Sequence, residues 1–305
     1  MPYILLTLSV LLGSARNIFT KKTESPKGTI FNAVKVNTIT FAFSFLAVFL
    51  IGILNVKTTF EVPWILVLFY AVFTLLNQLF IAKAVSLGSV SLTGLFASCG
   101  FVIPTLFGSI YYKEPLNALH IIGIVLIILS FVFSMKKEGG KKFNFGWLLL
   151  AIGGLVTAGA LGVVQKIFTS DYSGYKLNNF MSMSFALILI ANLIALFFIW
   201  LLHKKDTPTQ TEKTEALTKK QKVLEIIFIA ILGVSLGAIH SINTNLSGLL
   251  PSAVAFPVIN GGVIILTTVL SKLFFKEKLT LLQIVGLIIG VLSIGCITLA
   301  DALIF

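Results

Sequence analysis

The sequence predicts an all-α membrane protein with ten transmembrane helices, arranged as two inverted repeats of five helices each. Three observations lead to this prediction. Hydrophobic residues make up 57% of the 305 residues and charged residues only 11%, the apolar residues gather in long runs, and a polar turn recurs in the second half. A chain with this composition is too apolar to be a water-soluble globular protein. We therefore expect a multi-pass protein of a cell membrane, the plasma or inner membrane.

Ten apolar runs are long enough to cross a membrane. A spanning helix needs about 20 mostly apolar residues, because each residue rises about 1.5 Å through hydrocarbon about 30 Å thick. Helices are expected because they satisfy their own backbone polar groups in lipid. The runs are Tyr3–Thr20, Ile30–Leu54, Pro63–Val85, Val90–Tyr112, Ala118–Met135, Phe145–Thr169, Leu177–Leu202, Val223–Leu246, Ser252–Phe275 and Leu281–Ile304.

The first run has an alternative interpretation, because Gly13-Ser14-Ala15 resembles a signal-peptidase site. The run lacks a basic segment before its apolar core, and it has a counterpart in the second half of the chain. We therefore interpret it as the first transmembrane helix.

An internal repeat is visible in the polar turns after the fourth and ninth runs. Lys113-Glu114-Pro115-Leu116-Asn117 follows the fourth run, and Lys276-Glu277-Lys278-Leu279-Thr280 follows the ninth, 163 residues later. Earlier in each half the offset is 149, and the long link at residues 203–222 absorbs the difference. The aligned pairs include Gly123 with Gly286, Ser130 with Ser293, Asn77 with His240, and Arg16 with Gln165.

Five helices per half make the second repeat enter the membrane from the opposite side. Residues 1–138 and 139–305 are therefore expected to form two inverted repeats within one membrane domain. Such repeats are related by a pseudo-two-fold axis in the membrane plane, with a site near the middle of the membrane.

The five-plus-five pattern resembles the drug/metabolite transporter superfamily, in particular its ten-helix EamA-like branch. The resemblance is carried by the Glu-x-Leu-[Asn/Thr] turn after the fourth and ninth runs, followed by Gly123 or Gly286. It implies a central cavity lined by the first, third, fourth, sixth, eighth and ninth helices. It says little about the solute.

Polar side chains inside the spans are the candidate binding residues, because insertion of a charged group costs about 2.5–3.5 kcal/mol in the middle of a helix. Residues spaced by three and four share one helical face, and two such faces occur, in the third and eighth runs. The alternative is that these groups only hydrogen-bond between helices and that His240 is a neutral, satisfied imidazole. The candidates are Tyr70, Thr74, Asn77, Gln78, Ser98, His240, Asn243 and Asn260.

Two basic residues, Arg16 and Lys166, occupy adjacent register positions in the two repeats. Near a span end such side chains can reach the headgroups. If they turn inward, they favour an anionic or zwitterionic solute by charge pairing. No carboxylate lies in the middle of a span, which disfavours lipophilic cations.

Several other classes of function are disfavoured. Cys99 and Cys296 lie in apolar runs without metal-ligand spacing. No nucleotide-binding loop or catalytic constellation occurs, and no soluble basic face with interleaved aromatics fits nucleic acid. We expect no metal, no cofactor, no enzymatic activity and no nucleic-acid partner.

These patterns favour a secondary transporter that moves a small polar metabolite, anionic, zwitterionic or neutral, by alternating access through a central cavity. Two alternatives remain, an exporter of drugs or toxic compounds and a non-transporting receptor or assembly subunit. The expected partners are the solute and membrane lipids, with the chain a monomer or a homodimer.

Charge and resemblance predict opposite orientations. All of the 23 Lys and Arg residues except Lys57, Lys113, Lys166 and Lys176 lie in or beside the links after odd-numbered runs. By the positive-inside rule those links are cytoplasmic and both termini are outside. The resemblance implies cytoplasmic termini, and we expect the orientation that the charge predicts.

Overall fold

The computed structural model describes residues 2–23, 30–55, 61–87, 90–134, 145–203, 219–275 and 280–302. These residues form α-helices joined by short turns, and no strand occurs among them. The predicted all-α class is confirmed. The helices are α1 (Pro2–Thr23), α2 (Ile30–Asn55), α3 (Trp64–Leu87), α4 (Val90–Cys99), α5 (Val102–Tyr111), α6 (Ala118–Ser134), α7 (Phe145–Asp171), α8 (Leu177–His203), α9 (Lys219–Leu249), α10 (Ser252–Phe275) and α11 (Leu281–Ala302).

The described helices have the length and the surface of a membrane protein. Eight helical segments are long and apolar enough to cross a membrane, and α1 and α6 contribute shorter apolar stretches, Pro2–Ile18 and Ala118–Phe133. Large apolar side chains such as Leu79, Ile110 and Leu299 are exposed on the outside of the bundle, where lipid tails would cover them. The chain is therefore a multi-pass membrane protein.

The predicted span Val90–Tyr112 is long and apolar enough to cross a membrane over Thr93–Tyr111, but it consists of two helices rather than one. The chain breaks at Gly100 and Phe101, between α4 and α5. Pro104 has no N–H to donate to the Gly100 carbonyl, which instead accepts from Ile103 N at 3.1 Å. A Cβ on Gly100 would lie 2.8 Å from the Leu155 carbonyl of α7, so this glycine lets the break pack closely on α7.

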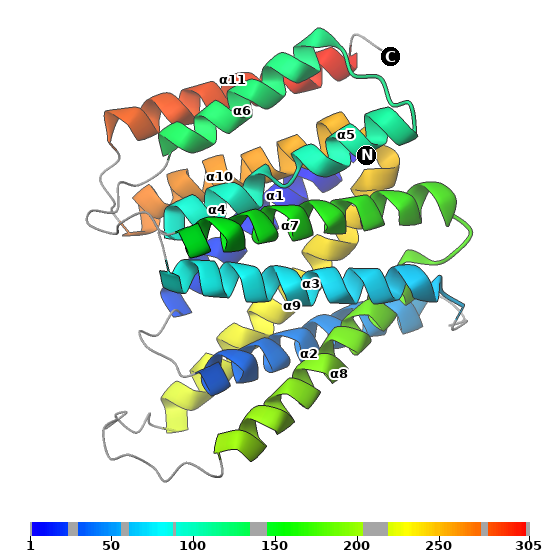
Figure 1. Cartoon of the computed structure of the whole chain (residues 1–305), viewed down its shortest axis with the longest axis vertical. Helices are drawn as coiled ribbons and strands as arrows, with labels where there is room; N and C mark the ends of the chain where they lie inside the picture. Colours follow the sequence, from blue (N-terminus) through cyan, green and yellow to red (C-terminus); the bar gives the residue numbers. More distant parts are fainter. Residues whose placement is uncertain are drawn as a thin grey trace.

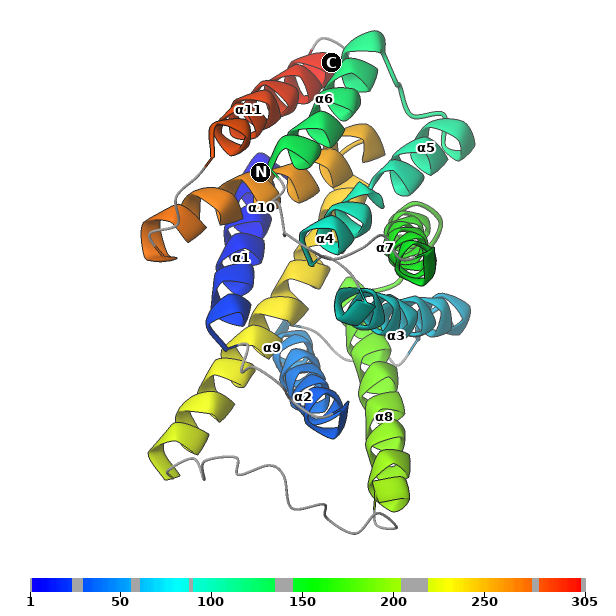
Figure 2. The ribbon, with the colours of Figure 1, turned by 60° about the vertical axis from the view of Figure 1, so that its left-hand side comes forward.

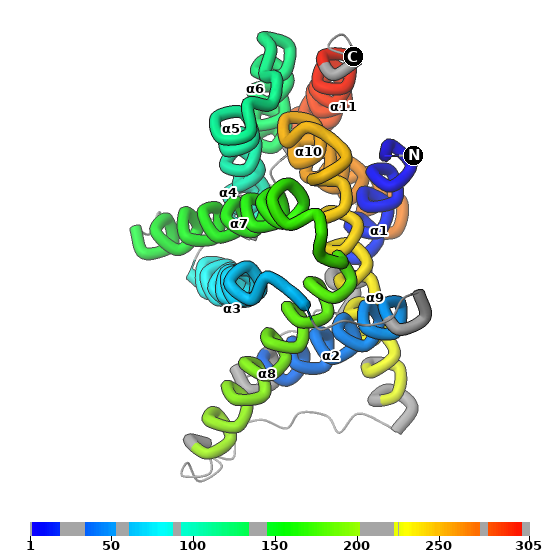
Figure 3. The backbone as a smooth tube through the Cα atoms, turned by 90° about the vertical axis from the view of Figure 1, so that its right-hand side faces the viewer, coloured from blue at the N-terminus to red at the C-terminus, as the bar shows by residue number. Residues whose placement is uncertain are grey.

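The helices lie roughly side by side, in a bundle that is elongated across the helix axes (Figure 1). Helix α3 packs on α7, α2 packs on α8 and α9, α1 packs on α9 and α10, and α6 packs on α11. Figures 2 and 3 show α6 and α11 at one end of the long axis and α2 and α8 at the other.

Two clusters of buried apolar side chains hold the helices of the bundle together. One cluster joins α2, α3, α7, α8 and α9 through residues such as Phe41, Tyr70 and Phe180. Another joins α1, α9, α10 and α11 through Leu6, Leu246 and Ile297. Residues from the first and second halves of the chain meet in both clusters.

The aligned pairs of the repeat make matching contacts between α6 and α11. Ser130 donates its hydroxyl to the Gly286 carbonyl at 2.6 Å, and Ser293 donates to the Gly123 carbonyl at the same distance. A Cβ at Gly123 would overlap the Ile297 side chain. The small residues therefore let the two helices approach closely, as is common in membrane interfaces.

The same two helices also begin in the same way. Before α6, His120 N donates to Asn117 Oδ1 at 3.0 Å and Asn117 N donates to His120 Nδ1 at 3.3 Å. Before α11, Thr280 N donates to Gln283 Oε1 at 3.0 Å and Gln283 N donates to Thr280 Oγ1 at 3.3 Å. Each pair is a reciprocal capping box, which satisfies two otherwise unpaired N–H groups of a helix start.

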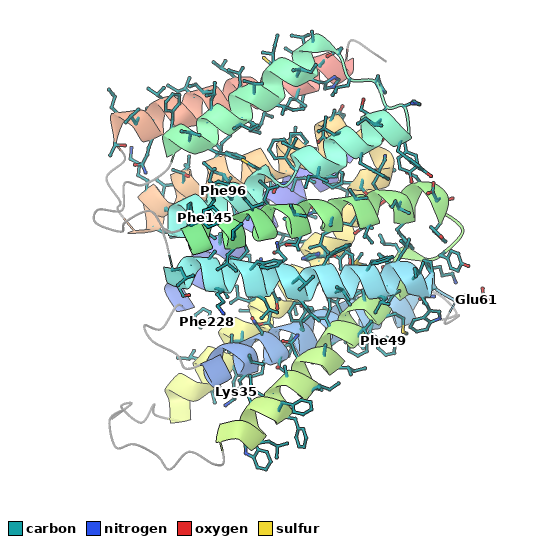
Figure 4. All side chains as sticks on the ribbon, viewed as in Figure 1. Lys35, Phe49, Glu61, Phe96, Phe145 and Phe228 are labelled. Carbon is teal, nitrogen blue, oxygen red and sulfur yellow. The ribbon has the colours of Figure 1, made fainter. Side chains whose placement is uncertain are left out.

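Orientation stays a prediction, and the structure provides two matched reporters for it. Figure 4 places the exposed Lys35 and Glu61 at opposite ends of the helix axes, which correspond to the two membrane faces. Ser173, exposed between α7 and α8, lies at the end with few basic residues, and Ser86, exposed near the end of α3, lies at the basic end. In a background without cysteine, we expect a membrane-impermeant thiol reagent on intact cells to label Ser173→Cys and to spare Ser86→Cys. The reverse pattern would establish cytoplasmic termini.

Candidate functional site

Polar side chains from α3, α7 and α9 meet inside the bundle around Tyr70. Tyr70 is fully buried, and its hydroxyl shares a short hydrogen bond with His240 Nδ1 on α9. Gln165 of α7 also hydrogen-bonds to this hydroxyl. Phe185 of α8 contacts the His240 ring edge-on, with the ring centroids 5.9 Å apart. Gln165, Tyr70 and His240 therefore form a continuous polar chain within an apolar bundle.

Helix α1 adds a polar contact and a positive charge to this region. Ser9 donates its hydroxyl to Asn243 Oδ1, one turn along α9 from His240. Arg16 of the same helix is half-buried and is close enough to interact electrostatically with His240. We call Arg16, Tyr70, Gln165, His240 and Asn243 the central polar cluster.

The other predicted residues of α3 lie beside this cluster but bond elsewhere. Asn77 donates its amide to the Gly154 carbonyl of α7 at 2.9 Å and to Thr157 Oγ1 at 3.1 Å. Thr74 is buried and donates to the Tyr70 carbonyl of its own helix. Gln78 is half-buried. The register pairing of Asn77 with His240 therefore does not take the form of a direct contact.

Ser98 and Asn260 lie in α4 and α10, away from the contacts just described. Ser98 is half-buried, and its carbonyl accepts a hydrogen bond from Phe101 N at 3.4 Å at the break between α4 and α5. Asn260 donates its amide to the Phe256 carbonyl of its own helix at 2.9 Å. Both bonds are local to their helices.

Lys166 turns into the bundle and forms a second polar group. It pairs with Glu114, which follows α5, and the two side chains are 7% and 14% exposed. Lys166 also donates to the Ser247 carbonyl of α9 at 2.9 Å. Glu114 accepts from Ser252 N at the start of α10 at 2.7 Å. We call Lys166, Glu114, Ser247 and Ser252 the clasp.

Tyr112 lies beside Lys166 of the clasp. Its ring lies 5.8 Å from Lys166 Nζ, and its hydroxyl donates to Asp171 Oδ2 at 2.9 Å. Partial burial raises the pKa of Tyr112, and the nearby Asp171 carboxylate raises it further. The phenol therefore stays protonated and remains a donor at physiological pH.

Comparison with known proteins decides the family. A family profile, that of the EamA-like transporters, matches residues 1–136 and 145–299. The chain belongs to the EamA-like transporter family. This family is part of the drug/metabolite transporter superfamily, so the resemblance seen in the sequence is confirmed.

Two individual proteins are similar to this EamA-like chain. An uncharacterised protein of Haemophilus influenzae strain Rd is 24% identical over 241 residues, which are 78% of this chain and 77% of that protein. A solved crystal structure of a protein covers 99% of this chain and 98% of its own, with a TM-score of 0.73 at 15% identity. The latter likeness shows the fold.

In this EamA-like chain, sequence reasoning identified some polar neighbours and missed others. Four of the predicted residues belong to the central polar cluster, namely Tyr70, His240, Asn243 and Arg16. It missed Gln165 as a member, although its alignment with Arg16 was a usable signal. The described residues contain no group of three or more His, Cys, Asp or Glu side chains that could hold a metal ion.

It also missed the partner of Lys166. Glu114 was placed at a span end, and nothing in the sequence pairs it with a residue 52 positions later. Glu114 lies at a span end as predicted, after α5, but its carboxylate is largely buried because it pairs with Lys166. Because this carboxylate is already paired, the structure adds no support for binding of a lipophilic cation.

Proposed function

We propose that this protein is a secondary transporter that moves a small polar metabolite across the membrane by alternating access between two inverted five-helix repeats. The observation that carries the proposal is the central polar cluster. Its members come from α1 and α3 of the first half and from α7 and α9 of the second. Such groups are costly inside a membrane protein and are usually retained for function.

The chemistry of the cluster favours a solute with hydrogen-bond acceptors. Tyr70 occupies Nδ1 of His240, which leaves Nε2 of this half-buried ring to face a solute. Arg16 supplies positive charge nearby, and a guanidinium binds carboxylates and phosphates well. Lys166 contributes less than the sequence suggested, because Glu114 neutralises it. We therefore expect an anionic or zwitterionic metabolite.

The matching contacts of the repeat support the alternating-access part of the proposal. When the two halves of the chain are interchanged, the Ser130–Gly286 hydrogen bond maps onto the Ser293–Gly123 hydrogen bond. The capping box of α6 likewise maps onto that of α11. Inverted repeats packed in this way can rock about a fixed site and open it to each side in turn.

A ligand screen followed by a flux measurement tests the proposal. The purified protein would be melted with organic acids, amino acids, sugars and nucleosides, since a ligand at 100 times its Kd stabilises the binding state by about 2.7 kcal/mol. We expect stabilisation by an acid or amino acid, and uptake of that compound by proteoliposomes. Stabilisation without uptake would identify a receptor instead. Stabilisation only by hydrophobic cations would identify a drug exporter.

A further inference from the structure

The clasp joins the two halves of the chain at one end of the bundle. Glu114 belongs to the first half, and Lys166, Ser247 and Ser252 belong to the second. In Figure 1 the ends of α5, α7, α9 and α11 and the starts of α1 and α10 lie on the same side, at one end of the helix axes. A relative movement of the halves that opened this end would therefore have to break the pair.

The surrounding residues are shaped to admit the Glu114 carboxylate. A Cβ at Gly108 of α5 would overlap Glu114 Oε2 and would lie 2.7 Å from the Ser252 Cβ. Thr105, one turn earlier on α5, donates its hydroxyl to the Ser252 carbonyl at 3.3 Å. The carboxylate thus holds α5 against the first N–H of α10, where a helix favours negative charge.

The contacts around the pair suit a bond that forms and breaks. Removing two charges from water costs about as much as their attraction returns, so a buried ion pair adds little net stability. Each partner would regain hydration when this end of the bundle opened. An uncompensated charge would remain costly if only one partner were removed.

We propose that the clasp is a gate that holds this end of the transporter closed and breaks in each transport cycle. The inference rests on the proposed function and deepens it. The device is not duplicated by the repeat, since the position aligned with Lys166 is Asn17, which carries no charge. Asn17 is exposed and donates to Thr267 Oγ1 at 3.3 Å. The position aligned with Glu114 is Glu277, which lies outside the described residues.

Thiol labelling from each side of the membrane tests the gate. Ser241 of α9 is half-buried with a buried hydroxyl, and it lies six residues before Ser247, or about 9 Å along the helix. In a background without Cys99 and Cys296, Ser241→Cys would be labelled by an impermeant reagent in right-side-out and in inside-out vesicles. Glu114→Gln keeps an acceptor for Ser252 but loses the charge, and Lys166→Met removes the cation.

We expect either clasp variant to raise labelling from the clasp end about tenfold, which corresponds to about 1.4 kcal/mol, and to lower labelling from the other end. Lys166→Arg keeps the charge, so Ser241→Cys should be labelled as slowly in this variant as in the protein with Lys166. Tyr112→Phe removes a hydrogen bond between the same two halves at this end, to Asp171, but leaves both clasp charges in place, so it should change the labelling less than either clasp variant.

Two outcomes would overturn the gate. One is unchanged labelling in both clasp variants, and the other is faster labelling from both ends, which indicates loosened packing. Solute flux separates the two proposals. If the wild-type protein carries a solute and labelling is unchanged, the gate fails and the transporter stands. If the labelling shifts and no solute is carried, the gate stands and the transport function fails.

Discussion

Replacing His240 with alanine is expected to reduce transport about 10- to 100-fold while membrane abundance stays near that of the wild type. His240 is half-buried, it shares a hydrogen bond with the Tyr70 hydroxyl, and Arg16 is close enough to interact with it electrostatically. A lost hydrogen bond to a charged group costs about 1.5–3 kcal/mol, and about 1.4 kcal/mol corresponds to a factor of ten in rate. The measurement is initial uptake by proteoliposomes of the solute found in the ligand screen.

A double-mutant cycle separates solute binding from packing. Tyr70→Phe removes only the hydroxyl that contacts His240. If His240 served Tyr70 alone, His240→Ala would cause no further loss in the Tyr70→Phe background. We expect a further loss of at least about tenfold, because in the proposed site Nε2 of His240 contacts the solute.

Asn192→Ala is the matched control for this cycle. Asn192 is also a buried amide in a span, but it donates to the Ile188 carbonyl of its own helix, α8. Its replacement should leave uptake close to that of the wild type. Equal uptake by His240→Ala and wild type would remove His240 from the site.

The positions of the helices were predictable from the sequence because membrane insertion imposes a length and a composition. The predicted and observed bounds differ by a few residues, with the largest extension at α9, which begins at Lys219 rather than Val223. The break at Gly100 was less predictable. A proline inside a span, such as Pro104, favours a bend, but a full interruption also depends on the close approach to Leu155 of α7, which is a tertiary contact.

The candidate site was predictable in its polar residues and less so in their partners. Periodicity placed His240 and Asn243 on one face of α9, and in the structure His240 contacts Tyr70 and Asn243 contacts Ser9. Asn77 shares a helix face with Tyr70, yet it donates to Gly154 and Thr157 of α7 and not to His240. Hydrogen-bond partners depend on the rotation of each helix against its neighbours, which a single sequence does not specify.

Replacing Gly233 with alanine is expected to destabilise the protein, although alanine favours an isolated helix over glycine by about 1 kcal/mol. Gly233 of α9 lies against α2, and a Cβ there would overlap the Thr40 carbonyl and lie 2.7 Å from the Phe43 Cβ. Ser44 of α2 also donates to the Gly233 carbonyl at 2.7 Å. Backbone atoms cannot rotate out of the way, so α2 and α9 must separate.

Overpacking of this kind costs about 1–3 kcal/mol, and valine at the same position should cost more than alanine. The measurement is the melting temperature of the purified protein in detergent. Gly295→Ala on α11 is the matched control, because a Cβ there meets no atom within 4 Å. Helix propensity acts alone at Gly295 and should leave the melting temperature equal or higher, whereas at Gly233 the contact with α2 should lower it. A Gly233→Ala protein that melts at or above the wild-type temperature would show that α2 and α9 do not pack this closely.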